Sequence, residues 1–115
     1  MDASIDLAYL IPYSKMNYQA IIKSIQCDQF KEVTNKGKWL EDSANVYAKE
    51  IGQNLFLVFI TVKDIDTESI RAMIGHFEDF NSIGLKEPKQ IMFYLSIKNK
   101  EDLHYFDKYL KVPEI

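Results

Sequence analysis

The sequence has few of the residues from which most recognisable functional sites are built. Its one cysteine, Cys27, excludes an internal disulfide and a four-cysteine zinc site. A lone cysteine also fits a reducing, cytoplasmic setting. Its one arginine, Arg71, accompanies a formal net charge of -3, whereas nucleic-acid-binding domains usually carry a basic, often arginine-rich face. We therefore expect no direct binding of DNA or RNA.

Glycine and histidine are equally sparse, which excludes further classes of site. The four glycines lie far apart, so neither a phosphate-binding loop nor a dinucleotide fingerprint can be built from them. His76 and Asp79 are three residues apart, but zinc needs at least three protein ligands. We expect no cofactor and no metal. The acidic start, Met1-Asp2-Ala3-Ser4, does not resemble a secretory leader.

What the chain does have is apolar content sufficient for a core. With 115 residues, 47% of them hydrophobic and 27% charged, the sequence predicts one globular domain spanning residues 1–115. Residues 55–60 are apolar without a break, and Val62 extends the run. A strand that is covered on both faces shows such a run, and the run is far too short to span a bilayer. We predict a central strand over residues 54–62.

Further elements are predicted on both sides of this strand. Residues 4–11 are strand-like, and a helix capped by Ser14 or Asn17 should run to about residue 28 with Ile21 and Ile25 buried. Residues 38–51 fit a helix with one apolar stripe: Leu40, Ala44, Tyr47 and Ile51. The alternative is a strand over residues 45–50 that forms a hairpin through Gly52-Gln53-Asn54.

After the central strand, the pattern predicts helix, strand and helix. A helix capped by Asp66 or Thr67 should bury a stripe made of Ile70, Met73, Ile74, Phe77 and Phe80. Residues 91–97 form a second apolar strand, and Asn99 caps a last helix with Leu103, Phe106 and Leu110 on one side.

The fold class expected from this order is α/β, or α+β. The predicted domain is layered, with a central mixed sheet of three or four strands covered by about four helices. Residues 54–97 read as strand, helix and strand, which makes the two strands parallel if they share a sheet.

Residues 37–42 and 60–64 carry acidic residues and lysines, and together they resemble the cores of restriction-endonuclease-like enzymes. Residues 37–42 and then Ile60-Thr61-Val62-Lys63-Asp64 are similar to the arrangement in which acidic residues and a lysine hold magnesium and position water. Thr61 stands where that family has a metal-binding acid, and a hydroxyl cannot supply the negative charge that a hard cation needs. The resemblance implies a scaffold that has lost catalysis, or a hydrolase using Lys63, Asp64 and Asp42.

Tyrosines and carboxylates are the candidates for contact with a partner. Tyrosine combines a large apolar area with a polar tip and concentrates at protein interfaces. Acidic residues that do not serve a helix dipole can attract a basic partner. The predicted contact residues are Tyr13, Tyr18, Asp66, Glu78, Asp79, Tyr105 and Tyr109.

The sequence therefore favours a small intracellular module that docks on a protein partner, with a basic protein as one candidate, and inhibits or neutralises it. Immunity proteins that neutralise toxins, and inhibitor proteins, act in this way without catalysis. The alternatives are a nuclease-like hydrolase and a structural subunit of a homo-oligomer. No interaction with a membrane is expected.

Overall fold

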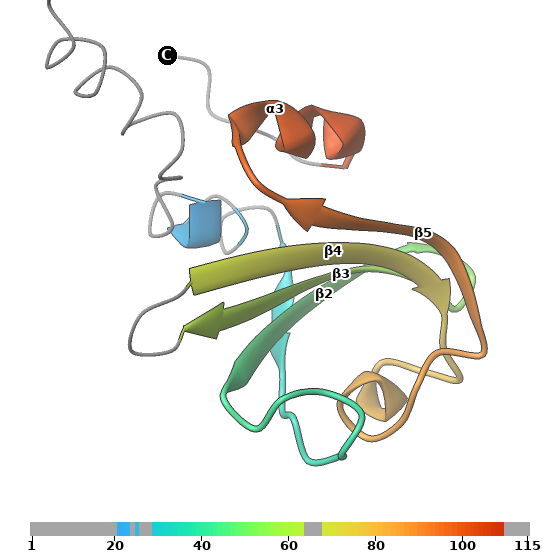
Figure 1. The fold of residues 1–115 in the computed structure, drawn as a ribbon. Helices are drawn as coiled ribbons and strands as arrows, with labels where there is room; N and C mark the ends of the chain where they lie inside the picture. Colours follow the sequence, from blue (N-terminus) through green and yellow to red (C-terminus); the bar gives the residue numbers. More distant parts are fainter. Residues whose placement is uncertain (1–20, 24, 26–28, 64–67, 110–115) are drawn as a thin grey trace, which may run out of the picture.

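The computed structural model describes residues 21–23, 25, 29–63 and 68–109. Within this part of the chain, five antiparallel strands form one sheet in the order β1-β2-β3-β4-β5 (Figure 1). The strands are β1 (Lys31–Val33), β2 (Ala44–Gly52), β3 (Leu55–Lys63), β4 (Glu68–His76) and β5 (Gln90–Ile97). Three short helical elements accompany them, the 3-10 turns η1 (Asn81–Gly84) and η2 (His104–Phe106) and the helix α3 (Lys100–Leu103). Residues 21–23 and 25 are also helical.

The predicted mixed sheet covered by about four helices is wrong. Each strand pairs antiparallel with the next one along the chain. In particular, β4 pairs directly with β3, with Lys63 opposite Glu68, so a strand stands where the helix of the predicted parallel crossover to residues 91–97 was expected. The described residues form an antiparallel meander, in which neighbours in sequence are neighbours in space.

The predicted helix over residues 38–51 is a turn followed by β2, so the hairpin alternative is confirmed. Gly52 pairs with Leu55 across a two-residue connection, and Asn54 adopts φ 55°, a left-handed conformation that asparagine tolerates. The stripe that suggested a helix divides between the two faces of the sheet. Leu40 and Ala44 pack on one face, whereas Tyr47 and Ile51 pack on the other.

The predicted helix after the central strand is wrong for the same reason. Residues 68–76 form β4, and the apolar stripe again divides: Ile70 and Ile74 lie on one face, Met73 and Phe77 on the other. A strand that is buried on both faces has apolar residues at odd and even positions. Residues spaced by three and four therefore occur in it, as they do on one side of a helix.

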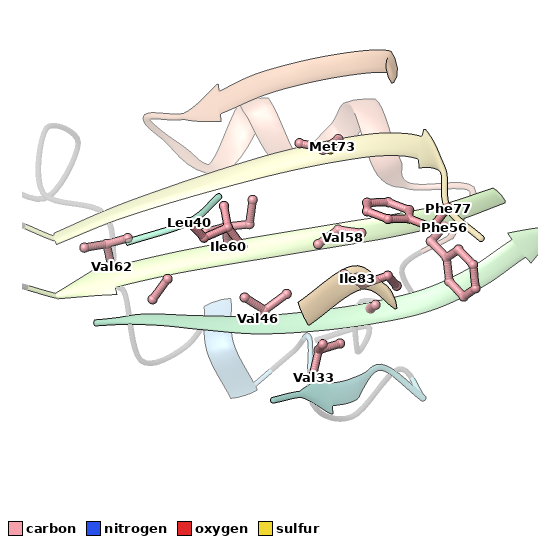
Figure 2. Packing of buried hydrophobic residues seen from close by; sticks show 12 residues of the cluster. Val33, Leu40, Val46, Phe56, Val58, Ile60, Val62, Met73, Phe77 and Ile83 are labelled. Carbon is pink, nitrogen blue, oxygen red and sulfur yellow. The ribbon is translucent and has the colours of Figure 1, made fainter. Parts of the chain in front are cut away.

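The central strand is confirmed as β3, and it is buried on both faces. Its alternating residues enter two hydrophobic clusters that the sheet separates. The helix-side cluster consists of Ile21, Ile25, Phe30, Tyr47, Leu57, Phe59, Ile70, Ala72, Ile97 and Phe106. The loop-side cluster, shown in Figure 2, consists of Val33, Leu40, Ala44, Val46, Ala48, Phe56, Val58, Ile60, Val62, Met73, Phe77 and Ile83.

Two loops that hydrogen-bond to each other cover the loop-side cluster. The backbone N–H groups of Lys36 and Gly37 both donate to the carbonyl oxygen of Gly84, at 2.8 and 2.7 Å. Trp39 Nε1 donates to the carbonyl oxygen of Ile83 at 3.0 Å, which holds η1 against the sheet. A Cβ at Gly84 would lie 1.9 Å from the Thr34 carbonyl oxygen, so only glycine permits this approach.

Short helical segments cover the opposite face. Ile21 and Ile25 are buried there as predicted, and Phe59 makes edge-to-face contacts with Phe30 and Phe106 at 5.4 and 5.6 Å between ring centroids. The predicted cap of the last helix is confirmed, because Asn99 Oδ1 accepts from the Asp102 N–H at 3.1 Å. Figure 1 shows α3 on the side of the sheet opposite η1.

The predicted strand over residues 4–11 and the predicted position of Leu110 lie outside the described residues. Nowhere in the described ranges is there a helix with the length and apolar content needed to cross a membrane.

Candidate protein-binding surface

Strand β5 presents large apolar side chains to solvent. Ile91, Met92, Phe93 and Tyr94 are 51%, 55%, 37% and 48% exposed. These four residues are consecutive, so apolar side chains are exposed on both faces of the strand. Phe56 to Ile60 of β3 are buried, although both strands are similarly apolar. The difference is position in the sheet, because β3 has a strand on each side and β5 has β4 on one side alone in the described part of the chain.

The two edges of the sheet differ in how they resist further pairing. β1, at one edge, is three residues long, and a very short edge strand offers little to a further strand. β5, at the other edge, is eight residues long and contains neither a charged residue nor a proline. Lysine is found just beyond its ends, at Lys89 and Lys98. An exposed apolar edge of this kind is a template for pairing with another chain.

One irregularity interrupts the β4–β5 ladder. Ile74 pairs with Phe93, but Gly75 pairs with Ile91, so Met92 has no partner residue in this register. An extra residue of this kind bends a strand and increases its twist. The register shift falls within the exposed apolar run of β5.

Tyr105 extends the apolar surface beyond the strand. It is 67% exposed, and its ring lies 6.0 Å from that of Phe93. Phe93 also contacts the buried ring of Phe106 at 5.7 Å, which fixes it against the helix-side cluster. An open hollow of about 330 Å³ adjoins Tyr105 and is otherwise lined by Glu101, Asp102 and His104. The predicted contact residue Tyr105 therefore belongs to the same surface as β5.

An ion pair flanks the other face of β5. Arg71 pairs with Glu41 and opposes Ser96 across the β4–β5 ladder. The hydrogen bond from Arg71 lowers the pKa of the Glu41 carboxyl group. Burial disfavours the charge on Arg71, but the hydrogen bond and charge of Glu41 and the adjacent Tyr94 outweigh it and raise the arginine pKa. The single arginine thus anchors a loop beside Tyr94.

Glu78 and Asp79 lie on the loop side of the sheet and have local partners. Glu78 Oε1 is 3.0 Å from Lys86 Nζ, and both side chains are more than half exposed. Asp79 Oδ1 accepts from the Ser82 N–H at 2.9 Å, which holds the turn that leads into η1. This turn belongs to the loop-side cluster through Ile83, whereas Tyr105 lies on the helix side. Glu78 and Asp79 therefore lie on the opposite side of the sheet from Tyr105.

The remaining predicted contact residues have other positions. Tyr109 is half-buried against the helix-side cluster, and its backbone carbonyl accepts from Lys49 Nζ at 3.1 Å. Its role is therefore partly structural. Tyr13, Tyr18 and Asp66 lie outside the described residues.

Among the residues considered for chemistry, His76 and Lys63 lie at opposite ends of the β3–β4 pair, and Asp64 lies outside the described residues. His76 ends β4 and is not helical, while His104 Nδ1 lies 3.1 Å from Asp107 Oδ2 at the surface. Lys63 lies 3.6 Å from Glu68 across the β3–β4 pair. Within the described residues no group of three or more histidine, cysteine, aspartate or glutamate side chains could hold a metal. Between the two stretches of the nuclease-like resemblance, residues 37–42 and 60–64, the structure has β2 and the start of β3.

Comparisons with protein-family models, with curated proteins and with solved structures found no match. The exposed apolar surface on β5 is therefore the feature from which we infer a function. Sequence reasoning identified residues 91–97 as a strand but missed their exposure. The signal that could have found it is the order of strands, since the last strand of a meander lies at an edge.

Proposed function

We propose that this protein is a protein-binding module that acts by docking and not by catalysis, and that β5 is its contact strand. The observation that carries the proposal is the run of four consecutive large apolar side chains, Ile91 to Tyr94, that are between 37% and 55% exposed on one edge strand. Exposed apolar patches rimmed by polar residues mark interaction sites. Here Gln90 and Ser96 bound the run on the strand.

The mode of binding that this edge supports is addition of a strand. Main-chain groups of β5 supply hydrogen bonds to an extended partner segment, and its side chains supply apolar contacts. Tyr105 enlarges the contact area on the helix side, and Tyr94 does so beside Arg71. The inhibitory or neutralising action of an immunity protein, in the cytoplasm, is the form of this function that the sequence predicts, and it stays a prediction.

A capture experiment tests the proposal. The full chain carrying an affinity tag is incubated with an extract of its source cells, in parallel with Met92→Lys and Leu85→Lys. Both positions are exposed to a similar degree, 55% and 52%, but Leu85 follows η1 and is not on β5. A charge on an edge strand blocks pairing. Proteins retained by wild type and Leu85→Lys but lost with Met92→Lys support the proposal. Identical capture by all three contradicts it.

Inhibition is tested separately once a partner is captured. Adding the purified module at equal concentration should abolish the partner's activity if the module is an inhibitor. If the partner binds through β5 but keeps its full activity, docking is supported and inhibition is ruled out. Met92→Lys, which should not form the complex, is the control for non-specific effects of added protein.

A further inference from the structure

We infer that the partner of β5 is a second copy of this chain, paired antiparallel with it about a two-fold axis that passes through Phe93. This inference rests on the proposed function, because it names the occupant of the same edge. In a dimer of this kind the two sheets of the protomers join into one continuous sheet, β5 against β5.

The first argument is the self-complementary pattern of β5. Its apolar run extends from Ile91 to Leu95, with Phe93 at the centre and the polar residues Gln90 and Ser96 at the two ends. In an antiparallel pair, opposed side chains interact directly. Pairing of the strand with itself about Phe93 sets Met92 against Tyr94, and the extra residue at Met92 shifts the residues before it by one position. Because the run is apolar on both faces of the strand, apolar residues oppose one another through the centre of the pair.

The second argument is symmetry. A two-fold interface uses the same patch on both copies, so a patch that is complementary to itself is sufficient. The absence of charge from Gln90 to Ile97 means that no pair of like charges is opposed within the strand. The lysines that flank the strand, Lys89 and Lys98, lie beyond the apolar run at its two ends.

The third argument is the area available. We take about 200 Å² as the full area of each large side chain, a value within the range for aromatic residues. The exposed fractions of Ile91, Met92, Phe93, Tyr94 and Tyr105 then correspond to about 500 Å² on each copy. A dimer that covered all of this surface would bury at most about 1,000 Å², which is the lower limit for a specific interface. Backbone hydrogen bonds between the strands add to this contact. A reversible dimer with a dissociation constant in the micromolar range is the expected result.

Sedimentation velocity of the untagged full chain, over about 1 to 500 μM to span a micromolar constant, measures the association. Wild type should shift from monomer to dimer with increasing concentration. Met92→Lys should raise the dissociation constant at least about tenfold, and Leu85→Lys should leave it unchanged. Circular dichroism of each variant verifies that the sheet has folded. A wild type that stays monomeric throughout overturns the inference, as does a dimer that Met92→Lys leaves intact in a folded protein.

Cross-linking tests the axis independently of affinity. On a Cys27→Ser background, Phe93→Cys should form a covalent dimer under mild oxidation at 100 μM, while Leu85→Cys should not. Equal cross-linking at both positions contradicts pairing about Phe93. The outcome for the proposed function is separate. If the chain is monomeric but captures a different protein through β5, the inference of a second copy fails and the proposed function stands. If the chain is monomeric and no capture depends on β5, both fail.

Discussion

Truncation of Phe59 gives the strongest test of the architecture. Phe59 is fully buried at the centre of β3 and contacts Phe30 and Phe106 edge-to-face. Removal of a buried phenylalanine side chain costs about 3–5 kcal/mol, because transfer free energy is lost and a cavity remains. We expect Phe59→Ala to lower the free energy of unfolding by about 4 kcal/mol, a large part of the stability of an ordinary domain, about 5–15 kcal/mol.

Phe93→Ala is the matched control, because the same side chain is removed from the edge strand. Phe93 is 37% exposed, so its replacement opens no closed cavity. Complete burial of such a side chain contributes about 1.5–3 kcal/mol, and the partial burial of Phe93 predicts a loss of about 1–2 kcal/mol. The difference between the two losses thus measures how much the interior position of β3 contributes to the free energy of unfolding.

Urea denaturation at submicromolar protein concentration, below the expected dissociation constant of the dimer and followed by Trp39 fluorescence, measures both losses. The low concentration keeps association through β5 from contributing. If Phe59→Ala leaves too little folded protein, Phe59→Leu should show a smaller loss in the same direction. Equal losses for the Phe59 and Phe93 variants, or a loss below about 2 kcal/mol for Phe59→Ala, would refute the placement of β3 in the interior.

Three further predictions concern the loops. Gly84→Ala forces a Cβ against the Thr34 carbonyl and should cost about 1–3 kcal/mol in urea denaturation; an unchanged midpoint would contradict the close approach of the two loops. Arg71 lowers the pKa of Glu41 from its ordinary value of 4.5, so the pair stabilises the protein above that pH and loses this effect as pH falls through the lowered pKa. Glu41→Gln should therefore cost at most about 1 kcal/mol at pH 7 and less below the lowered pKa of Glu41 or in high salt; a cost independent of pH would show that the charge is irrelevant. Asn99→Ala should cost about 0.5–2 kcal/mol, and Asn99→Asp should retain the cap; an equal loss with both would exclude capping.

Several elements followed from the sequence because their signals are local. The run in residues 54–62 could be placed as an interior strand, because continuous apolar residues need cover on both faces. Asn99 was recognisable as a cap from its position before the final apolar pattern. Gly52-Gln53-Asn54 could be identified as a turn, although the hairpin was the second choice.

The helices predicted over residues 38–51 and 67–80 are wrong because apolar residues spaced by three and four have two physical explanations. They can line one face of a helix, or they can lie on both faces of a buried strand. In β4, Ile70 and Ile74 reach the helix-side cluster and Met73 reaches the loop-side cluster, so one apparent stripe serves two cores. Periodicity cannot separate these explanations when a sheet is buried on both faces, since the pattern of burial is set by what covers each face.

The candidate surface shows the same division between local and tertiary information. The composition of residues 91–97 determined that they form an apolar strand, as that of residues 54–62 did. Only the tertiary structure decided that one strand is interior and the other is an edge. A strand is shielded by its neighbours in the sheet and by what packs above and below it, and its own residues do not specify how many neighbours it has.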